Sequence, residues 1–174
     1  MGGCQQELEA GLDALAVTLD AERLARLAAY ADELVRWNRR LNLTGARTAA
    51  ELAAGPLFDA LTLVPVLEPL GRLLDVGSGG GLPGIPAAIA VGGLPVTLVE
   101  PRARRAAFLR HAVHLLGLDA EVVEARAEEL APGGFAGAVA QAVWPAAQWV
   151  RRGVELVGPG GAVYALAGEP VGEA

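Results

Sequence analysis

Five short apolar segments, each followed by a longer helical or loop segment, constrain the fold of this chain most strongly. They cover residues 73–76, 96–99, 120–123, 138–140 and 162–166. Short runs rich in Val, Leu and Ala between turn residues are typical of buried strands. Strands that alternate with helices predict a parallel sheet with helices on both faces and right-handed connections. The sequence therefore predicts an α/β fold.

The first part of the chain follows a helical pattern instead. Leucines recur at helical spacing from Leu8 to Leu19, and Asp20 is placed to cap a second helix. We therefore expect a helical extension over residues 1–55 in front of a core over residues 56–174, the two forming one compact unit. Further helices are expected over residues 57–67, where Pro65 breaks the helix, and over residues 102–116 and 145–156. A tight turn is expected over residues 158–161.

Charge and hydropathy exclude several classes of protein. The chain has 14 basic and 20 acidic residues, a formal net charge of −6, so any contact with RNA must be local. No apolar run approaches the roughly 18 uninterrupted residues of a membrane span, and the first residues do not resemble a secretory signal. We expect a soluble, cytoplasmic protein. His111 and His114 lack a neighbouring Cys or His, so we expect no metal site.

A glycine-rich segment over residues 75–84 carries the strongest functional signal. It follows a predicted strand and precedes a helix, so its glycines allow a sharp turn and a close approach of backbone amides to a ligand. The next predicted strand ends at Glu100, where an acidic side chain is the usual acceptor for the two ribose hydroxyls of an adenosine. The loop and the acid together predict a site for a nucleoside cofactor.

Two cofactors fit this loop. The spacing of Gly79, Gly81 and Gly84 also satisfies the dinucleotide pattern, so an NAD-dependent enzyme is an alternative. Asp75 favours S-adenosylmethionine, because a carboxylate suits a sulfonium and an amino group but repels a pyrophosphate. Pro83 also removes an amide donor that a phosphate would use. The cofactor-binding residues predicted from the pattern are Asp75, Gly77, Ser78, Gly79, Gly81, Glu100, Ala127 and Glu128.

Three segments together resemble a known family. Residues 37–44, the loop from 75 to 86 and residues 102–110 are similar to the bacterial 16S ribosomal RNA guanine-N7 methyltransferases, the GidB/RsmG family once named glucose-inhibited division protein B. The resemblance implies a Rossmann-like class I S-adenosylmethionine-dependent methyltransferase, and it adds Leu82 and Gln141 to the predicted cofactor-binding residues. It also implies transfer to guanine N7 in the 530 loop of 16S rRNA in the 30S subunit. Such a reaction requires no general base, so no catalytic residue is expected.

The resemblance also indicates which residues face RNA. Arg39 and Arg40, beside Trp37, fit a phosphate clamp with a stacked base, and equally a solvated helix end with a buried tryptophan. The predicted RNA-facing residues are Arg39, Arg40, Asn42, Thr44, Asp59 and Trp144.

The chain departs from the family pattern at several places. Gln141 stands where the family has an arginine, and Ala167 where it has a lysine. Of a His-x-x-Asp-Ser segment only Asp59 is kept. We expect the C-terminal antiparallel hairpin of the fold to be missing, which leaves the last strand as an apolar edge through which copies of the chain would associate. A paralogue that binds the cofactor without methylating RNA is therefore a further alternative.

Overall fold

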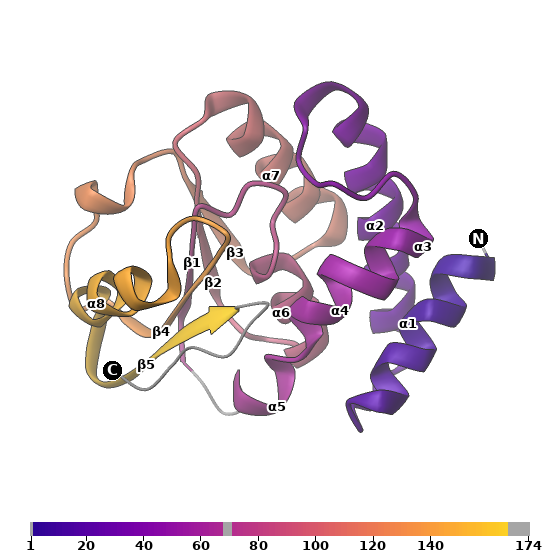
Figure 1. Cartoon of the computed structure of the whole chain (residues 1–174), viewed down its shortest axis with the longest axis horizontal. Coiled ribbons are helices and arrows are strands. Elements are labelled where there is room, and N and C mark those ends of the chain that lie inside the picture. The colour runs from indigo at the N-terminus through magenta and orange to yellow at the C-terminus, as the bar shows by residue number, and fades with distance from the viewer. Residues whose placement is uncertain (1, 68–70, 167–174) are drawn as a thin grey trace.

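The computed structural model describes residues 2–67 and 71–166, and it has a five-stranded parallel sheet at its centre (Figure 1). The strands are β1 (Leu73–Val76), β2 (Val96–Val99), β3 (Ala120–Val123), β4 (Phe135–Gln141) and β5 (Val157–Leu166). Their spatial order is β3-β2-β1-β4-β5, and every pair is parallel. The predicted α/β fold is confirmed.

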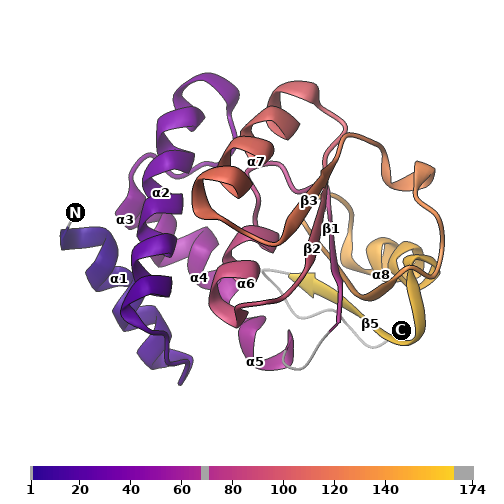
Figure 2. The same ribbon diagram turned by 180° about the vertical axis from the view of Figure 1, so that it is seen from behind.

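Helices cover both faces of the sheet. The N-terminal helices are α1 (Gly2–Ala14), α2 (Ala21–Leu41), α3 (Ala49–Leu52), the π-helix η1 (Ala53–Leu57), α4 (Phe58–Leu61) and α5 (Val64–Leu67). The later helices are α6 (Gly84–Val91), α7 (Ala103–Leu116), the short 3₁₀ helix η2 (Ala127–Glu129) and α8 (Ala146–Leu156). The views from front and back place α8 on one face and the other long helices on the opposite face (Figures 1 and 2).

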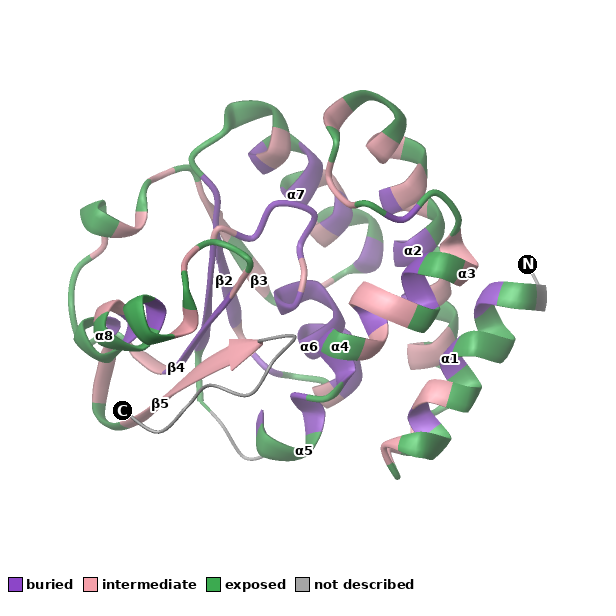
Figure 3. Ribbon diagram, in the orientation of Figure 1, coloured by how far each residue is buried: buried purple, intermediate pink, exposed green. Residues whose placement is uncertain are grey.

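Alternate residues of each strand pack into two separate hydrophobic cores on the two faces of the sheet. Leu73 packs into the larger core, which joins α1, α2, α6 and α7, whereas Leu74 packs into the smaller core under α8. The strands of the sheet's centre are buried on both faces (Figure 3). A parallel sheet covered in this way has near-continuous apolar strands, as the sequence has. Asp75 lies on the same face of the sheet as Leu73, so its carboxylate is directed towards the start of α6.

The N-terminal helices join the larger core directly. Asp20 caps α2 by accepting a hydrogen bond from the Arg23 amide at 2.8 Å, and Asn42 ends it in the left-handed conformation. Leu27 and Leu34 of α2 are fully buried, and α2 packs against α6 and α7. The helical extension and the sheet therefore share one hydrophobic core.

Two local predictions need correction. The helix expected over residues 57–67 does break before Pro65, between α4 and α5, but it begins earlier than expected, at Ala49, and includes the π-helix η1 around Pro56. Residues 158–161, expected as a turn, lie within β5 but interrupt its pairing. The register passes from Phe135 opposite Val157 directly to Gly137 opposite Ala162. Ala167 lies outside the described residues.

One apolar stretch reaches the length of a membrane span. Ala49–Leu67 has 19 residues and a mean hydropathy of 1.4, although Glu51 and Asp59 interrupt its apolar residues. It is not one straight helix, however, but the broken series from α3 to α5, and it packs on α1 and α6. Its buried residues Leu52, Leu57 and Leu61 belong to the larger core. This packing accounts for its apolar character.

Candidate functional site

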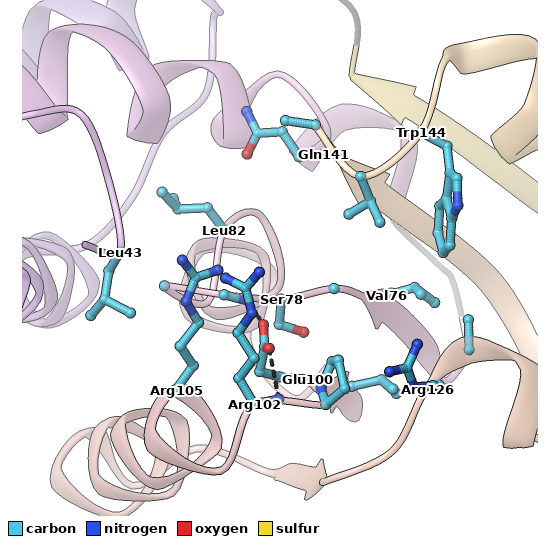
Figure 4. A pocket seen from close by; sticks show the side chains of 18 of the residues that line it. Leu43, Val76, Ser78, Leu82, Glu100, Arg102, Arg105, Arg126, Gln141 and Trp144 are labelled. Carbon is cyan, nitrogen blue, oxygen red and sulfur yellow. Dashed lines mark hydrogen bonds between the residues drawn. The ribbon is translucent and has the colours of Figure 1, made fainter. Parts of the chain in front are cut away.

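A cavity of about 680 Å³ lies at the carboxyl ends of the strands (Figure 4). Its walls come from the loops that follow β1, β2, β3 and β4, and from the segment after α2. In a parallel α/β sheet this is where ligands bind. Ten of the residues predicted for cofactor or RNA line it: Thr44, Gly77, Ser78, Gly79, Leu82, Glu100, Ala127, Glu128, Gln141 and Trp144.

The loop after β1 forms the floor of the cavity. Its first amides, those of Gly77 and Ser78, both donate to the Val99 carbonyl at 2.8 and 3.0 Å, which joins the loop to β2. Gly77 has a φ of +73°, and a Cβ there would lie 2.5 Å from Cγ2 of Val143. Only glycine adopts this conformation without strain in so narrow a space. The result is a cradle of bare backbone of the kind that an adenosine cofactor requires.

Glu100 is the acid at the end of β2, and it is only 3% exposed. Its Oε2 accepts from the Gly79 amide at 3.0 Å, and its Oε1 from the Arg102 amide at 2.9 Å. A carboxylate has about four acceptor sites, so two remain for ligand hydroxyls. Glu100 therefore fits the predicted role of ribose acceptor and also fixes the glycine loop.

Asp75, one of the predicted cofactor-binding residues, does not line the cavity. It lies below the loop, fully buried, and its Oδ2 accepts from the Gly84 amide at 3.1 Å. Its Oδ1 has no hydrogen-bond partner. Burial raises the pKa of Asp75 to about 7, against the opposing effect of the Gly84 hydrogen bond. Gly81 is also buried below the loop, beside Ile85 and outside the cavity lining.

The loops after β3 and β4 form the opposite wall (Figure 4). Trp144 lies parallel to Trp149, with ring centroids 5.8 Å apart, and the Arg152 guanidinium lies 5.2 Å from the Trp144 centroid. Arg152 also pairs with Glu128 at 2.7 Å. The backbone amide of Glu128 itself, and then Arg152, hold the pKa of Glu128 below its ordinary value. Trp144 is thus fixed by α8 before any ligand binds.

The residues predicted to face RNA do not all meet in one place. Arg39 and Arg40 line a second groove of about 550 Å³, between α2 and α7. Asn42 is exposed and outside the cavity, but its carbonyl accepts from Arg105 at 3.0 Å. Asp59 is exposed on α4 and lines neither the cavity nor this groove.

Trp37 lines the second groove but is held by its neighbours. Its Nε1 donates to Glu33 at 2.7 Å, and its ring lies against Phe108 and His111. Of the two interpretations of this tryptophan, packing at a solvated helix end agrees better with these contacts than base stacking.

Several lining residues are not among the predicted site residues, although some lie in segments that the sequence analysis singled out. Leu43, Arg102, Arg105, Arg126 and Val143 all line the cavity. The spacing of Arg102 and Arg105 places them on adjoining turns at the start of α7, directly after Glu100, and this is the signal that identifies them. Leu43 lies within residues 37–44, one of the segments that carry the family resemblance.

The glycine loop is also tied to the N-terminal helices. The hydroxyl of Tyr30, on α2, donates to the Gly80 carbonyl at 2.7 Å, and Tyr30 is fully buried. Burial, and then nearby Asp75, raise the pKa of Tyr30 well above its ordinary value, so this hydroxyl stays a donor. The loop is therefore fixed from α2 on one side and from Glu100 on the other.

Comparison with known proteins shows the family to which the chain belongs. A family model described as rRNA small subunit methyltransferase G (GidB) matches residues 23–173. The chain belongs to this family. Ribosomal RNA small subunit methyltransferase G of Anaeromyxobacter sp. (strain Fw109-5) is 40% identical over 172 residues, 96% of this chain and 80% of that protein. The protein of the same name from Stenotrophomonas maltophilia (strain K279a) is 44% identical over 163 residues, 92% of this chain and 76% of that protein.

GidB membership confirms the resemblance and decides the cofactor. The chain is an S-adenosylmethionine-dependent methyltransferase, and the dinucleotide alternative is set aside. A solved structure of the mitomycin 7-O-methyltransferase MmcR has a TM-score of 0.55 and 21% identity, over 71% of this chain and 40% of that chain. It confirms the class I methyltransferase fold. In residues 2–67 and 71–166 no three His, Cys, Asp or Glu side chains are grouped as metal ligands would be.

Proposed function

We propose that this GidB family member methylates guanine N7 in the 530 loop of 16S rRNA, in the 30S subunit and therefore in the cytoplasm. Its curated relatives are named ribosomal RNA small subunit methyltransferase G. The observation that carries the proposal is the bare glycine cradle beside buried Glu100, in a chain of this family. We assign the adenosine of the cofactor to Glu100, Ala127 and Glu128, and its amino-acid end to the opposite side of the glycine loop.

The described residues match a reaction that needs alignment rather than proton transfer. When bound, the cofactor supplies an electrophilic methyl group on a sulfonium. Guanine N7 has an in-plane lone pair and no proton to lose, so the base gains the methyl group and the positive charge. Within the cavity the acidic side chains are Glu100 and Glu128, and Glu100 already accepts hydrogen bonds from two backbone amides. The chain's task is to hold the base in line and exclude water.

Methylation of purified 30S subunits tests this function. With subunits that lack the modification, we expect one methyl group per subunit, at a guanine of the 530 loop. N7-methylguanosine makes the RNA backbone cleavable by aniline after borohydride reduction, so primer extension locates the base. Transfer to a different nucleotide would refute the assigned target. Cofactor binding without transfer would favour the paralogue that binds but does not methylate, and Gln141→Arg would then test whether the missing cation is the cause.

The groove between α2 and α7 supports an RNA substrate. Arg36, Arg39, Arg40 and Arg104 line it. Arg36 pairs with Glu33, whereas over the described parts of the chain the other three form no ion pair. In a protein of net charge −6, a local group of unpaired arginines is suited to phosphates of the RNA backbone.

Replacing Arg39 and Arg40 together by glutamine is therefore expected to weaken binding of 30S subunits about tenfold at moderate salt. Each lost phosphate contact should also reduce the slope of log affinity against log salt by about 0.7 to 0.9. The expected kinetic result is a higher KM for subunits with an unchanged kcat. Arg23→Gln with Arg26→Gln, at the other end of α2, removes the same charge outside the groove. An equal loss in both double variants would show that only net charge matters.

A further inference from the structure

The turn that follows α2 forms one wall of the cavity, and a single side chain organises it. Nδ2 of Asn38 donates to the carbonyls of Thr44 and Ala46 at 2.8 and 3.0 Å. Oδ1 of Asn38 accepts from the amides of Leu43 and Thr44 at 2.6 and 3.0 Å. All four hydrogen-bonding positions of the amide are thus used within this turn. Leu43 and Thr44, which line the cavity, are held rigidly as a result.

Arg105 joins this turn to the cofactor loop. Its Nη2 donates to the Asn42 carbonyl at 3.0 Å, and a Cβ on Gly79 would lie 3.7 Å from its Nη1. The side chain is partly buried and lines the cavity beside Leu43 (Figure 4). A guanidinium has five N–H donors, so most of those on Arg105 are left for a ligand.

No carboxylate of the described chain neutralises Arg105. The ion pairs over residues 2–67 and 71–166 do not include it. Glu100, the nearest acid of the cavity in sequence, is already bound by the amides of Gly79 and Arg102. The positive charge of Arg105 is therefore available to a ligand of opposite charge. Arg102 and Arg126 also line the cavity but are exposed.

We propose that Arg105, fixed by the Asn38-organised turn, binds the carboxylate of the cofactor's amino-acid end. The assignment rests on the proposed orientation, in which the adenosine lies on Glu100, Ala127 and Glu128. Figure 4 shows Arg105 and Leu43 on the side of the cavity away from Arg126 and Trp144. An arginine fork also matches the planar geometry of a carboxylate. The helical extension thereby becomes part of the methyl donor site.

Calorimetry with two ligands tests the proposal on the full chain. S-adenosylhomocysteine contains the amino-acid end, whereas 5′-methylthioadenosine has the same adenosine without it. Arg105→Gln should weaken binding of S-adenosylhomocysteine about 10- to 100-fold, the range for a hydrogen bond to a charged group. Its effect on 5′-methylthioadenosine should stay below about twofold. Arg105→Lys, which keeps the charge but not the fork, should fall between the two.

Two further variants separate this proposal from the proposed orientation. Arg110→Gln removes the same charge from α7 at a residue that pairs with Glu124, outside the cavity, and should leave both affinities unchanged. Glu100→Gln should weaken both ligands, because both contain the ribose. Equal losses for the two ligands in Arg105→Gln, or unchanged affinity for S-adenosylhomocysteine, would overturn the role of Arg105. No loss in Glu100→Gln would instead overturn the orientation.

Discussion

Replacing Asp75 by asparagine is expected to remove a pH dependence of stability of up to about 4 kcal/mol. The Asp75 side chain is fully buried on the α6 side of the sheet, and its Oδ1 has no hydrogen-bond partner. Burial raises its pKa from an ordinary value of 3.8 to about 7, with a smaller contribution from Glu100. The folded protein therefore holds this proton far more tightly than the unfolded chain does.

The sign of the effect follows from this difference in proton binding. Below about pH 4 the carboxyl is protonated in both states, and its contribution to stability is fully present. As the pH rises towards 7, only the unfolded chain loses the proton freely, so stability falls. A difference of roughly three pKa units corresponds to about 4 kcal/mol. An asparagine amide has no such titration, while its oxygen still accepts from the Gly84 amide.

Urea unfolding of the wild-type protein and Asp75→Asn from pH 4 to 8 measures this contribution as a difference. The variant should gain stability relative to the wild type as the pH rises, and the difference should level off above pH 7. Asp59→Asn, at an exposed position on α4, is the matched control. A difference between wild type and Asp75→Asn that is the same at every pH would contradict the raised pKa.

Local patterns were sufficient to predict the sheet and the cofactor loop. The strands Leu73–Val76, Val96–Val99 and Ala120–Val123 have the bounds that their apolar runs predicted. The glycine loop lies between a strand and a helix, as expected, and Glu100 ends the next strand. Each of these features is specified by residues close together in the sequence.

The direction of the Asp75 side chain was not predictable from the same pattern. In a strand that alternates polar and apolar residues, the alternation shows which side chains face the core. The β1 strand is buried on both faces, so its sequence does not show which face Asp75 occupies. Only the packing of α6 on that face decides that this carboxylate caps a helix.

Contacts between the helical extension and the rest of the chain could also not be predicted from local sequence patterns. Tyr30 and Gly80 are 50 positions apart, and Arg105 and Asn42 are 63 apart. Both contacts depend on how α2 packs against α6 and α7, which periodicity alone does not determine. The sequence therefore predicted one compact unit but did not show which residues of the extension form part of the cavity wall.

Gly84→Ala is expected to destabilise the protein by about 2 to 5 kcal/mol and to abolish cofactor binding with it. Gly84 begins α6 at its closest approach to the sheet. A Cβ there would lie 2.6 Å from Cδ2 of Leu98, 2.7 Å from Oδ2 of Asp75 and 3.0 Å from Cβ of Asp75. Overpacking alone costs about 1 to 3 kcal/mol, and displacement of α6 also breaks the hydrogen bond from its amide to Asp75.

Double substitution distinguishes this clash from a general intolerance of alanine. Gly134→Ala, where a Cβ would meet no atom within 4 Å, should leave the free energy of unfolding nearly unchanged. Leu98→Ala removes one of the atoms that the added methyl group would meet, although it costs stability itself by leaving a cavity. Gly84→Ala combined with Leu98→Ala should therefore lose less than the sum of the single variants. Additive losses in urea unfolding would show that the added methyl group does not meet Leu98 of β2, because the shared clash is what couples these two positions.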